Sequence, residues 1–258
     1  MKISTLLATT ALVLATALGA QAAQVAALVG DKTLAIVDTT AKKVTKSMDV
    51  TGLDGALVGI DVRPADGMLY GLTAGGTLYT IAMDGKATMK SKLDTMLPAG
   101  AMATVDFNPV ADRLRVIGSD GTSLRVNPDD GKVTKDGSLK YAEADANKGK
   151  TPKVVAGAYT NSVKGAKETV LFDIDASTGA LVKQAPPNDG TLNTVGMLGG
   201  TMDSVAFDIW SDGTKNEAWA MTGDQLWSVD LATGKATAAA KIEGVKGTVK
   251  DIAILPAM

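Results

Sequence analysis

The stretch NPVADRLRVIGSDGTSLRVNPDDGKV, residues 108–133, decides the fold because it repeats an earlier part of the chain. Residues 63–87, RPADGMLYGLTAGGTLYTIAMDGKA, align with it from a shared proline to a shared Asp-Gly-Lys turn. Both segments contain short alternating apolar runs bounded by turn residues, which is typical of paired β-strands. A repeat of this size indicates an architecture built from similar small sheets.

Parts of the same unit recur along the chain. Its second half, a strand, a turn rich in Asp, Thr and Gly, and another strand, is found at residues 33–45, 169–182 and 225–238. Its first half recurs at residues 204–213 and again at the very end. A turn position that requires positive φ suits glycine, and we expect this conformation at Gly85, Gly131, Gly179 and Gly234.

The two ends of the chain complement each other. KDIAILP, residues 250–256, resembles the first strand of a unit that lacks its other strands, whereas residues 24–50 supply strands that lack a first one. Pairing them closes a ring and leaves no long unpaired edge. We therefore expect an all-β, five-bladed β-propeller, with an open β-sandwich as the alternative. The expected blades are residues 24–50 with 249–258, then 56–93, 101–139, 152–186 and 202–243.

The amino-terminal segment has the features of a cleavable secretory signal. Lys2 is followed by an apolar run that ends in the small-residue sequence Ala20-Gln21-Ala22. We expect residues 1–22 to be a signal peptide and residues 23–258 to be a single propeller domain. An uncleaved anchor is the alternative, although the run is short for a membrane span. The expected location is exported, periplasmic or extracellular, with no membrane insertion after signal removal.

The composition excludes several kinds of chemistry. The chain contains no cysteine and no histidine, so Ser-His-Asp and Cys-His catalysis and the usual histidine-bearing metal sites are absent. Its net charge of −2 and its lack of a basic run argue against nucleic acid as a partner. A calcium site built from oxygen ligands stays open, but no cofactor is expected.

Five segments resemble one exported bacterial family, which is known as domain of unknown function DUF4394. They are LVGIDVRPADGMLYGL (57–72), VDFNPVADRLRVIGSDGTSLRVNPDDGK (105–132), VVAGAYTNS (154–162), LFDIDASTGALVKQAPPNDGTLNTVG (171–196) and LWSVDLATG (226–234). The resemblance covers nearly the whole chain after residue 22. It implies an exported β-propeller, and it brings no activity and no functional residues.

Two arginines stand at alternating positions in a strand that should be buried. Pairing the apolar faces of the hairpin in residues 113–127 places Arg115 opposite Arg125 and Arg113 opposite Asn127. Opposed guanidinium groups repel unless an anionic group lies between them. One interpretation is an internal network with acids of a neighbouring blade, and another is a cleft that binds a carboxylate, sulfate or phosphate. Simple solvent exposure is the third.

Equivalent positions in other blades carry aromatic side chains. We assign Tyr70 and Tyr79 to this column in the second blade, and Trp219 and Trp227 in the fifth. Aromatic rings are expected where flat blades pack against each other. The third blade therefore differs from these blades, because it carries arginines at the positions that are aromatic in them.

Three further features are candidates for a site. Asp61 and Asp106 occupy matching positions in the first strands of adjacent blades, so they should line the central channel, as an acid/base pair, as calcium ligands or as hydrogen-bond acceptors. Residues 185–200 form a connector outside the blade pattern that is either a lid carrying Asn188 and Asp189 or a plain crossover. Residues 140–152 are expected to be a solvated loop.

These observations favour a non-catalytic binding or scaffold propeller. Its ligand is unknown: it is either a small anion-bearing molecule or a protein partner. The candidate binding residues are Arg113, Arg115, Arg125, Asn127, Asn188 and Asp189. The alternative is a calcium-assisted or carboxylate-based hydrolase or lyase that acts on a sugar or lactone through Asp61 and Asp106. A third possibility is an interaction protein that uses only its rim, with the arginines as internal struts.

Overall fold

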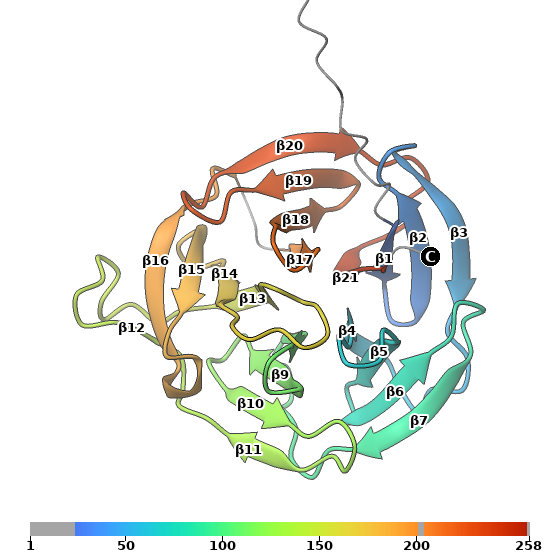
Figure 1. Cartoon of the computed structure of the whole chain (residues 1–258), viewed down its shortest axis with the longest axis horizontal. Helices are drawn as coiled ribbons and strands as arrows, with labels where there is room; N and C mark the ends of the chain where they lie inside the picture. Colours follow the sequence, from blue (N-terminus) through green and yellow to red (C-terminus); the bar gives the residue numbers. More distant parts are fainter. Residues whose placement is uncertain (1–23, 201–203, 257–258) are drawn as a thin grey trace, which may run out of the picture.

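The computed structural model describes residues 24–200 and 204–256, which form five small sheets arranged as a ring (Figure 1). The predicted five-bladed propeller is confirmed. The expected signal peptide, residues 1–22, lies outside the described residues. Within the two described ranges, no helix has the length and apolar character needed to cross a membrane.

The blades follow one another along the chain, and the strands of each blade are named in order from the axis outward. The first comprises β21 (Val249–Ile254), β1 (Gln24–Val29), β2 (Thr33–Asp38) and β3 (Lys43–Asp49). The second comprises β4 (Leu57–Val62), β5 (Leu69–Thr73), β6 (Thr77–Ile81) and β7 (Ala87–Lys92). The third comprises β8 (Ala103–Asn108), β9 (Arg113–Gly118), β10 (Ser123–Val126) and β11 (Val133–Lys135).

In the described residues, the fourth blade has five strands and the fifth has four. The fourth comprises β13 (Val154–Tyr159), β14 (Leu171–Asp175), β15 (Ala180–Gln184), β16 (Thr191–Met197) and β12 (Lys140–Tyr141), with a 3-10 helix η1 (Pro187–Asp189) between β15 and β16. The fifth comprises β17 (Ala206–Ser211), β18 (Asn216–Thr222), β19 (Gln225–Val229) and β20 (Ala236–Lys241).

The first blade closes the ring as predicted. Strand β21 pairs antiparallel with β1, and Val25 stands opposite Ile254. The first and last strands of the described chain are therefore neighbours in one sheet. The expected positive φ is also found at all four turn glycines, with values of 89°, 73°, 67° and 76° at Gly85, Gly131, Gly179 and Gly234.

The hydrophobic core is divided among the five interfaces between neighbouring blades. Strand β8 shows how one strand serves two interfaces, because successive side chains point to opposite faces. Val105 and Phe107 pack against the second blade, whereas Asp106 reaches the backbone of the fourth. The interface between the third and fourth blades thus receives the polar face of β8.

Two expectations about connectors are wrong. Residues 191–197 are not part of a lid or crossover; they form β16, which pairs with β15 and extends the fourth blade beyond its predicted end. Residues 140–152 are not wholly a solvated loop, since β12 pairs in parallel with β16 and Tyr141 is buried. The sequence TLNTVGM of β16 has no regular apolar alternation, because its side chains, apart from that of Leu192, are only partly covered or exposed.

Candidate functional site

The two opposed arginines lie in the third blade, where β9 pairs with β10. Arg115 stands opposite Arg125, which confirms the predicted pairing. On the other side of Arg115, the opposite residue is Asp106 of β8. The row Asp106–Arg115–Arg125 therefore crosses the blade on the face that meets the fourth blade.

The predicted aromatic column is right for its first member in each blade and wrong for its second. Tyr70 and Trp219 stand opposite inner-strand aspartates, as Arg115 does. Tyr79 instead stands opposite Gly71, and Trp227 opposite Ala220. A shift of one residue in a strand moves a side chain to the other face, and the sequence alignment contained such a shift.

Arg115 is almost completely buried and is held by the protein on every side. Its Nε donates to the Tyr159 hydroxyl at 3.2 Å, and its Nη1 donates to Ser123 Oγ at 3.0 Å and to Asp136 Oδ2 at 2.5 Å. Its Nη2 donates to Asn188 Oδ1 at 2.9 Å. Because its side chain is only 2% exposed, Arg115 does not open onto a concave surface.

Asp136 is the group that allows the two arginines to face each other. It accepts bonds from Arg125 Nε at 2.7 Å and from Arg125 Nη2 at 2.9 Å, a bidentate arrangement, while also pairing with Arg115. The hydrogen bond to Asp136 raises the pKa of Arg125. The side chain of Asp136 is 4% exposed and that of Arg125 is 34% exposed, so the pair extends from the interior to the surface.

The remaining predicted binding residues lie at the margins of this network. Arg113 is half-buried, and its Nη1 donates to the carbonyl oxygen of Asp112 at 2.9 Å. Asn127 Oδ1 accepts the backbone N–H of Asp129 at 3.1 Å, which shapes a turn. Asp189 ends η1 and is exposed. The structure thus brings Arg115, Arg125 and Asn188 together and leaves the other three outside. Their role in ligand binding stays a prediction.

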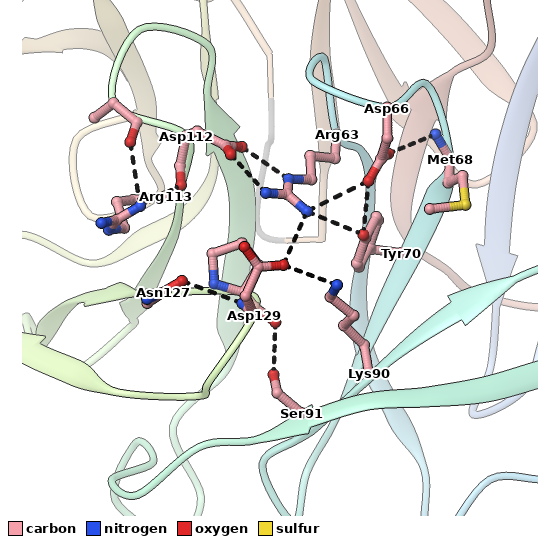
Figure 2. A network of polar contacts seen from close by, with 12 residues as sticks. Arg63, Asp66, Met68, Tyr70, Lys90, Ser91, Asp112, Arg113, Asn127 and Asp129 are labelled. Carbon is pink, nitrogen blue, oxygen red and sulfur yellow. Dashed lines mark hydrogen bonds and ion pairs between the residues drawn. The ribbon is translucent and has the colours of Figure 1, made fainter.

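A second arginine network, which the sequence did not reveal, joins the second and third blades (Figure 2). Arg63 holds Asp112 through Nε at 2.8 Å and through Nη2 at 2.5 Å. Its Nη1 lies 3.4 Å from both Asp66 and Asp129, and Lys90 pairs with Asp129 at 2.8 Å. Buried arginine–carboxylate networks whose arginine also contacts a neighbouring blade therefore occur twice in the described residues.

The innermost strands bring four buried aspartates to the axis. Oxygens of Asp61, Asp106 and Asp208 all lie within 4.8 Å of one another. The fourth aspartate, Asp251, lies on β21. Each carboxylate accepts a backbone N–H from the inner strand of the following blade. These bonds are Asp61 with Phe107 (2.6 Å), Asp106 with Tyr159 (3.0 Å), Asp208 with Ile254 (2.6 Å) and Asp251 with Ile60 (2.9 Å).

Burial controls the ionisation of these four carboxyl groups. It raises the pKa of Asp61, Asp106 and Asp251, and neighbouring aspartates add repulsion. Burial also raises the pKa of Asp208, to about 6. Over residues 24–200 and 204–256, none of the four forms an ion pair. Three converging carboxylates could supply oxygen ligands to calcium, although each is already fixed by an amide.

Asp173 of β14 is a further buried acid that the sequence did not single out. Neither of its oxygens accepts a hydrogen bond from the described residues. It stands opposite Gly157, where an added Cβ would lie 2.2 Å from Asp173 Oδ1, so glycine makes room for the carboxyl. Burial raises the pKa of Asp173 to about 8, although Arg115 partly lowers it.

Cavities lie at both ends of the axis. The first, of about 380 Å³, is lined by Val58, Ala101, Met102, Ala103, Val155, Ser204, Val205, Thr248 and Lys250, at the beginnings of the innermost strands. The second, of about 310 Å³, lies at the ends of these strands and includes Asp61 and Asp208. The loop between β13 and β14, which arches towards the centre in Figure 1, contributes Ser162, Val163 and Lys164 to the second cavity.

The sequence would have indicated some of the missed residues. Asp208 and Asp251 lie in the segments that repeat the first strand of the unit, so the alignment could have added them to Asp61 and Asp106. Asp136 could not be identified from the sequence, because it follows the short strand β11 in a connector that resembles many others in this chain.

Comparisons with known proteins found one matching family and several similar solved structures. The family described as domain of unknown function (DUF4394) matches residues 33–253. A solved protein of unknown function from Bacteroides caccae is similar, with a TM-score of 0.49, 13% identity, and coverage of 92% of this chain and 100% of that one. Another, from Bacteroides thetaiotaomicron VPI-5482, gives a TM-score of 0.51, 14% identity, and coverage of 81% and 54%.

A third similar structure is virginiamycin B lyase from Staphylococcus aureus. It gives a TM-score of 0.45 and 14% identity, with coverage of 84% of this chain and 69% of the lyase. Among curated protein sequences, none is matched to this chain. At such identities the structural likenesses bear on the fold alone.

Proposed function

The chain belongs to the DUF4394 family, and we propose that it works as an exported, non-catalytic binding or scaffold propeller. The proposal rests on one observation: the candidate catalytic carboxylates hold neighbouring blades together. Asp61 and Asp106 each accept a backbone N–H from the next blade, so they stabilise the ring. The leader-like residues 1–22 support export.

The arginine cluster fits the same role as an internal strut. Four donor contacts of Arg115 end on protein atoms, and one of them reaches η1 of the fourth blade. A ligand carboxylate would have to displace Asp136, which would leave a buried acid unpaired. Concave space is instead available at the two ends of the axis, and cavities of about 300–1,000 Å³ are usual for small ligands.

A thermal-shift screen of the purified chain tests the binding role. The panel comprises calcium, inorganic phosphate, sulfate, small carboxylates and neutral sugars, with product analysis of every stabilising compound by mass spectrometry. We expect at least one compound to raise the melting temperature and to be recovered unchanged. Chemical conversion of a stabilising compound would refute the non-catalytic role.

One observation favours a second candidate function, a carboxylate-based hydrolase or lyase acting on a sugar or lactone. Asp61 and Asp208 line the cavity of about 310 Å³, and a pKa of about 6 at Asp208 suits a general acid near neutral pH. If a compound is converted, Asp208→Asn should abolish turnover, whereas Asn127→Ala, which does not line that cavity, should not.

A further inference from the structure

We propose that the cavity at the beginnings of the innermost strands binds a small amphipathic acid, with an apolar body and one carboxylate group that pairs with Lys250. This inference deepens the proposed binding function and rests on it. It assigns the ligand to one end of the axis and specifies the class of molecule that this end accepts.

The shape of the cavity follows from the topology of the propeller. The innermost strands β4, β8, β13, β17 and β21 begin at the same end of the axis, where all five blades contribute to the lining. The cavity volume of about 380 Å³ lies in the range of small-ligand sites. A ligand seated there would contact every blade at once.

The walls favour an apolar body. Val58, Ala103, Val155 and Val205 present only hydrocarbon side chains, and Met102 is 44% exposed beside them. Transfer of apolar ligand surface from water to such walls is favourable. A free sugar, which has hydroxyls on all sides, would find few hydrogen-bond partners on these walls.

Among the described residues that line the cavity, one carries a charge, and it is a cation. Lys250 Nζ pairs with Asp31 Oδ1 at 2.6 Å, and the Lys250 side chain is 37% exposed. Asp31 is 69% exposed, and pairing with Lys250 lowers its pKa. An exposed pair of this kind contributes little to stability. The carboxylate of a ligand can therefore replace Asp31 as the partner of Lys250.

The buried aspartates set the orientation of the bound acid. Asp251 is the neighbour of Lys250 in β21, but its oxygens turn inward to the amides of Ile60 and Ile252. A ligand carboxylate placed deep in the channel would lose its hydration beside these buried acids, and any of them that is ionised would repel it. It should instead lie at the rim beside Lys250, with the apolar body against the valines.

Isothermal titration calorimetry with decanoate and decanol tests the inference, because the two molecules share a chain and differ in charge. We expect decanoate to bind about tenfold more tightly than decanol to the purified chain. Lys250→Met should weaken decanoate about tenfold and leave decanol unchanged, and Asp31→Asn should strengthen decanoate. Lys246→Met, an exposed lysine four residues away, is the matched control.

The outcomes separate this inference from the broader proposal. Equal binding of decanoate and decanol, or a decanoate affinity that Lys250→Met leaves unchanged, would overturn the inference. If decanoate does not bind while another compound of the thermal-shift panel does, the inference fails and the binding function stands. All variants concern exposed side chains, and their melting temperatures check that they are folded.

Discussion

Replacing Asp173 by asparagine should stabilise the protein at neutral pH. The carboxyl is buried without a hydrogen-bond partner among the described residues, and its pKa rises from 3.8 to about 8 on folding. Between these two values the folded protein retains a proton that the unfolded chain releases. Stability therefore falls as the pH rises through this window, by about 1.4 kcal/mol per pH unit.

The asparagine variant removes this dependence while keeping the size and shape of the side chain. At pH 7 we expect its free energy of unfolding to exceed that of the wild type by on the order of 4 kcal/mol. The difference should shrink as the pH falls and approach zero only below about pH 3, where the carboxyl is protonated in both states. Urea unfolding followed by tryptophan fluorescence at one-unit pH intervals from 3 to 8 measures both quantities.

Asp175, two residues along the same strand, provides a control of opposite sign. Burial raises its pKa, but hydrogen bonds from Tyr141, Lys153 and Ser177 outweigh that effect and lower the pKa overall. Asp175→Asn should therefore destabilise the protein at pH 7, and this loss should diminish below pH 4. If Asp173→Asn is less stable than the wild type at pH 8, or if its gain does not vary with pH, the buried-carboxyl reasoning is wrong.

Three further predictions concern the ring itself. Arg115→Met should lower the free energy of unfolding by about 3–5 kcal/mol because it weakens the pairing of Asp136 and also leaves Tyr159, Ser123 and Asn188 without their buried donor, whereas Arg125→Met, at a side chain that is 34% exposed and bonds only to Asp136, should cost clearly less; equal losses in urea titrations would contradict the strut role. Gly59→Ala places a Cβ 2.4 Å from a valine methyl and should cost about 1–3 kcal/mol, while Gly55→Ala, with nothing within 4 Å, should change little in the same titrations. Deletion of residues 249–258 should abolish cooperative thermal unfolding, and a sharp transition in calorimetry would disprove the need for closure.

The sequence predicts the ring well because the information is repeated. Each blade restates the same strand-turn-strand pattern, and the incomplete units at the two ends complement each other, as the pairing of β21 with β1 confirms. Strand β16 was missed because a partly exposed outer strand need not alternate. An outer strand is specified by its pairing partner more than by its own side chains.

The candidate site was predictable only where it shares that repetition. Asp61 and Asp106 could be found because they occupy equivalent positions, and the structure places them together at the axis. Apart from Ser123 of the neighbouring strand, the partners of Arg115 come from three segments that no period connects: a connector, a strand end and a 3-10 helix. Such contacts depend on how two blades meet, which periodicity along one chain does not encode.

The position of β21 has a consequence for synthesis. A nascent chain that has not yet reached Val249 carries β1 with its inner edge open, since the strand that covers it is made after the other described strands of the ring. Another molecule's β21 would fit that edge equally well, because the same residues and register are used. Crowded, newly made chains should therefore form strand-exchanged dimers, and slow release of the carboxyl terminus would favour them.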